Sequence, residues 1–108
     1  MRQCYDEKNI SKADILAKVT LYPTAQGGRE SATPSDKFGC LCVVNGVHFD
    51  CRLLLAGIGA LRPGQSVTVP IKFLDADTAK NFIGVGTRFF LREVKIIGEG
   101  EVEKLLFN

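Results

Sequence analysis

The sequence lacks the features that would mark a membrane protein or a polyanion-binding protein. Its longest uncharged apolar run, Leu53–Leu61, is nine residues long and contains two glycines, which is about half of what a membrane span needs. The net charge of +2 over 108 residues favours neither nucleic acid nor an anionic membrane by itself. Met1–Lys12 is polar and carries no signal-peptide pattern, so we expect a cytoplasmic protein whose four cysteines are thiols.

Patterns of catalysis and nucleotide binding are missing as well. The chain has no Walker A loop, and Gly27-Gly28 lacks the strand–loop–helix context of a phosphate-binding loop. It has one histidine, His48, and no Ser–His–Asp arrangement. Asp75 and Asp77 are better explained as caps of a short turn than as a catalytic pair. We therefore expect no enzyme activity, no catalytic residues, no cofactor and no bound nucleotide.

What is present indicates one all-β domain over residues 13–108. Met1–Lys12 has no apolar periodicity, so we expect a flexible tail over residues 1–12, or an arm that becomes ordered on a partner. Alternating apolar segments between turn signals predict strands over residues 14–22, 38–45, 47–55, 65–74 and 87–97. Gly98-Glu99-Gly100 is expected to turn the chain into a last strand that ends near Phe107. This spacing predicts a closed antiparallel barrel or a sandwich.

The strongest local signal is Asn45-Gly46, because a two-residue type I′ turn needs positive φ at both positions. This turn fixes the register of a hairpin, which sets opposite one another Val44 and Val47, Val43 and His48, Cys42 and Phe49, and Cys40 and Cys51. The cysteines, Val44, Val47 and Phe49 then face the core, whereas His48, Asp50 and Arg52 face outward.

Cys40, Cys42, Cys51 and His48 have the composition of a zinc site. However, His48 falls on the face opposite the cysteines, which argues against a metal and against a Cys–His dyad. We therefore expect buried free thiols and no metal. A metal and a Cys40–Cys51 disulfide stay open as alternatives, although the pair falls at a hydrogen-bonded position, which suits a disulfide less well.

Two surface features could bind a partner. Arg88 and Arg92 share a strand face with Phe90, and such an arrangement can stack on bases, although a solvated face with ion pairs to Glu93 or Glu101 is the simpler interpretation. The candidate RNA-binding residues are Arg29, Arg52, Arg88 and Arg92.

The second feature is the apolar run Leu53–Leu61, which shows no strict alternation and must be covered either by the chain's own tail or loops, or by a partner or second copy. The candidate protein-binding residues here are Arg29, Leu54, Ile58 and Arg62.

Four motifs carry a resemblance to a known family. They are the Gly27-Gly28-Arg29 loop, the Pro63-Gly64 turn, the segment Arg88–Glu93 and the segment Gly98–Val102. With these motifs, residues 15–107 resemble the third domain of elongation factor Tu and the equivalent barrel of related translation GTPases. The resemblance implies a six-stranded antiparallel closed β-barrel, here as a stand-alone domain. The chain departs from the family at Lys37–Cys42, where the family has Gly-Tyr-Arg-Pro-Gln-Phe, and at Val94–Ile97.

Three functions remain in view. The first is a non-enzymatic module that binds a protein partner, such as a component of the translation machinery, or a second copy of itself as a homodimer. The second is an accessory protein that binds RNA or tRNA, whose affinity would fall steeply with salt. The third is an inhibitor or immunity-type protein, for which the sequence holds no positive signal.

Overall fold

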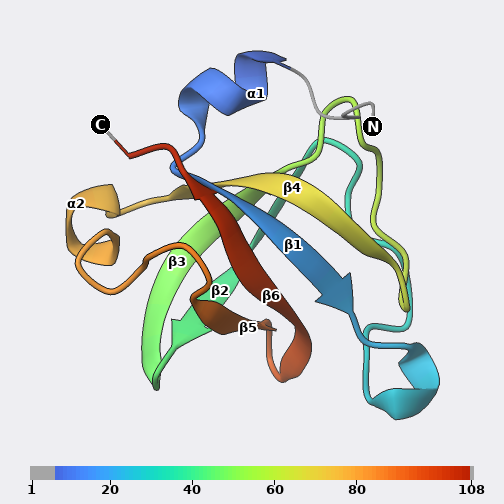
Figure 1. The fold of residues 1–108 in the computed structure, drawn as a ribbon. Coiled ribbons are helices and arrows are strands. Elements are labelled where there is room, and N and C mark those ends of the chain that lie inside the picture. The colour runs from blue at the N-terminus through green and yellow to red at the C-terminus, as the bar shows by residue number, and fades with distance from the viewer. Residues whose placement is uncertain (1–6, 108) are drawn as a thin grey trace.

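Six strands close into an antiparallel barrel in the order β1-β4-β3-β2-β5-β6 within residues 7–107, the part of the chain that the computed structural model describes (Figure 1). The strands are β1 (Ile15–Leu21), β2 (Lys37–Val44), β3 (Val47–Leu54), β4 (Ser66–Phe73), β5 (Arg88–Arg92) and β6 (Ile96–Leu105). Three short helical elements join them: α1 (Glu7–Lys12), η1 (Thr24–Gln26) and α2 (Ala76–Ala79). The predicted six-stranded closed barrel is confirmed.

The barrel interior is filled by alternate residues of every strand. On β1, Ile15, Ala17, Val19 and Leu21 are fully buried, whereas Lys18 between them is exposed. The largest fully buried side chains are Phe73, Ile15, Leu21, Leu53, Leu55, Leu61, Ile71, Leu91 and Ile97. Alternation of apolar and polar residues therefore determines which side of each strand faces the core.

The β2–β3 hairpin has the register that the sequence predicts. Asn45 has a φ of 49° and Gly46 a φ of 81°, as a type I′ turn requires. Cys40 lies opposite Cys51, and every other predicted pair is present. Val47 is the one predicted core residue of the hairpin that is not buried, at 38% exposure, because it lies next to the turn at the end of the barrel.

The prediction of one long strand over residues 87–97 is wrong. β5 ends at Arg92, the chain turns back with a hydrogen bond from the Glu93 amide to the Lys95 carbonyl (3.0 Å), and β6 begins at Ile96. The expected turn at Gly98-Glu99-Gly100 lies inside β6 instead. Gly100 is needed there because a side chain would meet the Phe89 ring, 2.3 Å from a Cβ built at that position. The glycines thus mark close packing within a strand and not a turn.

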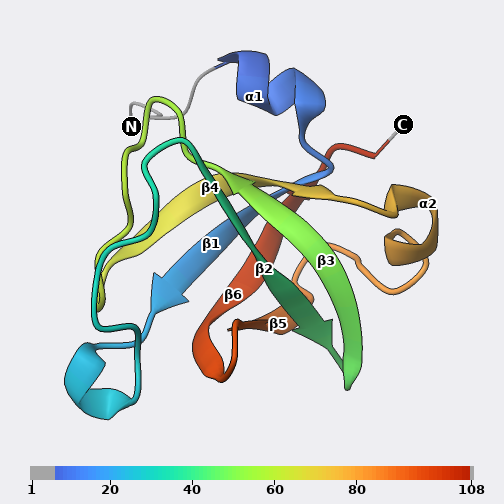
Figure 2. The same ribbon diagram turned by 180° about the vertical axis from the view of Figure 1, so that it is seen from behind.

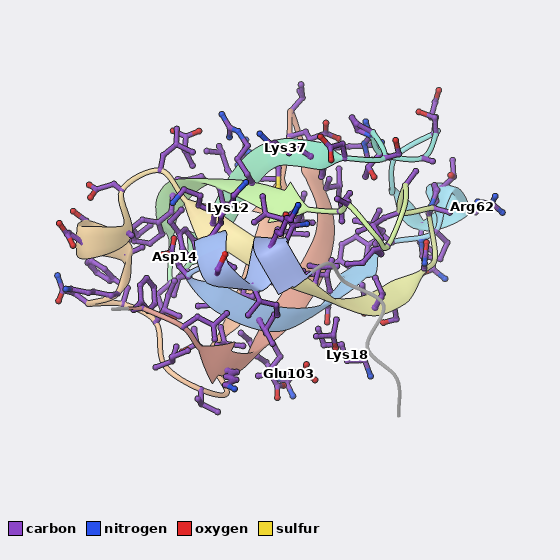
Figure 3. All side chains as sticks on the ribbon, turned by 90° about the horizontal axis from the view of Figure 1, so that it is seen from above. Lys12, Asp14, Lys18, Lys37, Arg62 and Glu103 are labelled. Carbon is purple, nitrogen blue, oxygen red and sulfur yellow. The ribbon has the colours of Figure 1, made fainter. Side chains whose placement is uncertain are left out.

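Residues 7–12 form α1, which differs from the flexible tail expected over residues 1–12; residues 1–6 lie outside the described part. α1 packs on β4, across the end of the barrel that Figure 3 shows from above. The outer sides of β1 and β4 carry a buried apolar pair here, Leu16 opposite Pro70. Asp14 joins α1 to the barrel, since its carboxylate accepts a hydrogen bond from the Phe73 amide (2.8 Å). A helix forms because an apolar surface is there to be covered.

The apolar run Leu53–Leu61 is covered largely by the chain itself. Leu53, Leu54, Leu55 and Leu61 are buried, and Ile58 packs against the core while remaining half-buried. The loop before β2 lies against the run through hydrogen bonds from the Leu55 amide to the Asp36 carbonyl (2.7 Å) and from the Leu61 amide to the Thr33 hydroxyl (2.9 Å). Of the two alternatives for this run, burial by the chain's own loops therefore applies to these four leucines.

Candidate functional site

The outer face of β5 carries two arginines and an aromatic ring. Phe89 and Leu91 point into the core, so Arg88, Phe90 and Arg92 point outward. Phe90 is 49% exposed and lies between Val43 of β2 and Glu99 of β6 in the strand register. An aromatic side chain that is half exposed in the middle of a barrel face is available for contact with another molecule.

Beside this face the barrel has a seam, which we define as the gap between the first half of β2 and the β5–β6 turn. β5 pairs with β2 only at residues 41–43, and in residues 7–107 no strand continues this pairing alongside Lys37–Cys40. A cavity of about 470 Å³ opens at the seam. Figure 2 views the barrel from this side, with β2 and β3 in front. The cavity lining includes Gly39, Cys40, Asp50, Arg52, Arg92 and Glu93.

Arg52 reaches the seam across Gly39, its neighbour on β2. A Cβ built on Gly39 would lie 3.0 Å from Arg52 Nη1, so the guanidinium occupies the space that a side chain at position 39 would need. Arg52 Nη1 donates a hydrogen bond to the Cys51 carbonyl (2.9 Å), which holds the side chain against the sheet. Arg92 approaches the same cavity from β5 and makes no side-chain hydrogen bond or ion pair with another described residue.

The side chain of Arg29 is largely buried, so it offers little surface to a partner. Its Nε donates to Glu93 Oε1 at 2.7 Å, and the two side chains are only 19% and 32% exposed. Nη1 donates to the Ser31 carbonyl (3.0 Å), and the guanidinium lies over the buried Phe38 ring, 5.0 Å from its centroid. Arg29 therefore ties the loop after η1 to the β5–β6 turn, and its charge is largely neutralised by Glu93.

The four candidate RNA-binding arginines lie at three separate places on the barrel. Arg52 and Arg92 line the same cavity, whereas Arg29 is engaged with Glu93. Arg88 lies apart from both, paired with Glu101 at 3.3 Å in a hollow of about 360 Å³ that Glu99 and Glu103 also line. Carboxylates lie near these arginines: Asp50 and Glu93 line the cavity of Arg52 and Arg92, and Glu99, Glu101 and Glu103 line the hollow of Arg88.

The candidate protein-binding residues are also separated. Leu54 is 4% exposed and Ile58 is half-buried, so Leu54 offers no surface to a partner in this structure. Arg62 is exposed on the turn before β4, away from α1 and from Lys37 (Figure 3). The seam is not predicted from the sequence, because one strand over residues 87–97 would have paired with β2 along its length.

The three described cysteines, Cys40, Cys42 and Cys51, are free and buried. Cys40 Sγ and Cys51 Sγ lie 3.8 Å apart. Burial, with a further contribution from Cys40, raises the pKa of the Cys42 thiol, and the contact with Cys40 followed by burial raises the pKa of Cys51. Thiols of this kind are poor nucleophiles. Among residues 7–107, His, Cys, Asp and Glu side chains do not gather in groups of three or more that could hold a metal ion. Cys4 lies outside the described part.

The chain was compared with models of protein families and with curated proteins. No protein-family model matches the chain, and no curated protein matches it. Within the described residues, α1 and α2 are both too short to cross a membrane as a helix.

Proposed function

We propose that this protein is a non-enzymatic binding module, active in the cytoplasm, whose docking face for a protein partner is the outer surface of β2, β3 and β5. One observation carries the proposal: Phe90, half exposed at the centre of β5, stands between Arg88 and Arg92 on the same outer face. Aromatic and arginine side chains dominate the binding energy of protein interfaces. Beside Phe90 lie the half-buried Leu41 and Val43, which extend the apolar area toward β3.

The charges favour a protein over RNA. A polyanion needs several unneutralised cations along one line, and each such contact steepens the dependence on salt. Here Glu101 pairs with Arg88 and Glu93 pairs with Arg29, which leaves Arg92 beside Asp50 at the edge of the face. Mixed charges around an apolar centre are the usual composition of a transient protein interface. The resemblance to the third domain of elongation factor Tu makes translation components the first partners to examine.

Affinity capture with matched variants tests the proposal. The wild type, Phe90→Ser and Val85→Ser are each used as bait, with Val85 as control because it is an exposed apolar residue (69%) in the loop before β5. We expect a protein that is captured by the wild type and by Val85→Ser, is lost with Phe90→Ser, and survives RNase. Equal capture by all three baits would contradict the proposed face. Capture that is lost with RNase would instead support the RNA-binding alternative.

A further inference from the structure

We propose that the first half of β2 binds an extended, acidic peptide segment of the partner by strand addition in the seam. This inference rests on the proposed function, because it names the kind of segment that the partner would supply. The added segment would continue the line of β5 beyond Arg92, where the chain itself turns away from β2. Lys37–Cys40, the open length, is about 13 Å at the usual rise of a strand, which is room for three to four residues.

The backbone of β2 offers donors and acceptors along this edge. Outward from the two-residue turn, Val44, Cys42, Cys40 and Phe38 exchange hydrogen bonds with β3, because such pairs alternate along an antiparallel ladder. Gly39 and Lys37 therefore direct their amide and carbonyl groups to the other side, toward the line of β5. Leu41, two residues further on, already pairs with Arg92 in this way. Gly39 is therefore the next position at which β2 could pair with a strand on the β5 side, after Leu41.

Because Gly39 has no side chain, the positively charged guanidinium of Arg52 can lie over this edge of β2. Arg52 lies over Gly39 and brings a guanidinium to the rung that has no neighbour. Arg92 stands at the adjacent rung, without an ion-pair partner among the described residues. Of the two carboxylates that line the cavity, Glu93 is held by Arg29. A carboxylate side chain of an added strand would therefore meet two guanidinium groups, which bind carboxylates well.

A peptide fits this edge better than a nucleic acid does. The edge presents carbonyl acceptors and amide donors in alternation, and a peptide backbone carries the complement of both. A phosphodiester backbone supplies acceptors only, so it would leave the carbonyls of Lys37 and Gly39 unpaired.

The test uses a phage-displayed library of random twelve-residue peptides, selected on the whole folded protein. We expect acidic sequences, and we expect that the synthetic peptides bind the Arg52→Gln/Arg92→Gln variant about tenfold more weakly in fluorescence anisotropy. The matched control is Lys18→Gln/Arg62→Gln, which removes the same charge at exposed sites outside the seam and outside the face around Phe90, and is expected to bind like the wild type. Melting curves confirm that both variants are folded.

Hydrogen exchange followed by NMR separates strand addition from simple ion pairing. The bound peptide is expected to slow exchange at the Gly39 amide, with little change at Cys40, whose amide already faces β3. Peptides that bind without protecting Gly39, or that bind both double variants equally, would overturn the inference. If no peptide is selected while the partner is still captured through Phe90, the strand-addition inference is wrong and the proposed function stands. If peptides are selected and protect Gly39 while Phe90→Ser leaves capture unchanged, the face around Phe90 is wrong and the seam remains the site.

Discussion

Replacing Arg29 with alanine should destabilise the barrel, although the sequence alone suggested a binding residue. The substitution removes the hydrogen bond to Glu93 at 2.7 Å, the bond to the Ser31 carbonyl and the contact with the Phe38 ring. A hydrogen bond to a charged group contributes about 1.5–3 kcal/mol, and a cation over an aromatic ring about 0.5–1 kcal/mol at exposed sites. Because the pair is partly exposed, we take the lower part of this range and expect a loss of about 2 kcal/mol.

For a domain of this size, such a loss lowers the melting temperature by roughly 8–15 °C. Urea denaturation of Arg29→Ala, Glu93→Gln and the double variant gives the coupling energy, which should be about 1 kcal/mol if the two side chains act together. Arg62→Ala, at an exposed arginine on the turn before β4, is the control and should stay within about 0.5 kcal/mol of the wild type. A loss below about 0.5 kcal/mol for Arg29→Ala, or additive effects of the two substitutions, would refute the structural role of this ion pair.

Three further outcomes follow from the same structure. Phe89→Ala should cost about 3–5 kcal/mol in chemical denaturation, because the ring is buried against Gly100; a loss under about 1 kcal/mol would place it outside the core. Gly46→Val should destabilise the hairpin by about 1–3 kcal/mol, since a β-branched residue resists a φ of 81°, and an unchanged melting point would contradict the type I′ turn. The folded state raises the pKa of Cys42 and Cys51, so their contribution to stability is complete below the ordinary thiol pKa of about 8.5 and is lost as the pH rises above it. The unfolding free energy should therefore fall by about 1.4 kcal/mol per pH unit for each such thiol, and Cys42→Ala should make this slope shallower; identical slopes would show that Cys42 keeps an ordinary pKa.

The hairpin and the inward-facing residues of most strands were predictable from the sequence because their determinants are local, whereas the choice of a six-stranded closed barrel over a sandwich came from the family resemblance. Alternation assigns each residue to a face of a strand, and Asn45-Gly46 fixes the register without reference to the rest of the chain. α2 was predictable for the same reason: Asp75 caps it through the Thr78 amide at 3.3 Å. In each case the residues that decide the structure lie within a few positions of one another.

α1 and the seam depend instead on tertiary contacts. Six residues are too few for a helical period to be recognised, and α1 is stable only because β4 offers an apolar surface beneath it. The end of β5 was misplaced because Val94–Ile97 has strong strand propensity, whereas the turn at Glu93 is held by Arg29 from a distant loop. Gly39 could have been a signal, since a glycine inside a strand often marks a close approach, but the identity of the approaching group, Arg52, requires the structure.

The contact between Arg29 and Glu93 helps to explain why the sequence predicts the fold better than the function. Two of the motifs that carry the resemblance, Gly27-Gly28-Arg29 and Arg88–Glu93, meet in space through the Arg29–Glu93 pair, 64 residues apart along the chain. Residues that hold a barrel together are required in any protein that uses it, whatever that protein binds. The residues that define the seam, Gly39, Arg52 and Arg92, serve the barrel less directly, because Arg52 bonds only to the carbonyl of its neighbour and Arg92 bonds to no other described side chain. An exposed cation without an ion-pair partner, as Arg92 is among the described residues, contributes little to stability, so its place beside the open strand edge fits the proposed binding role.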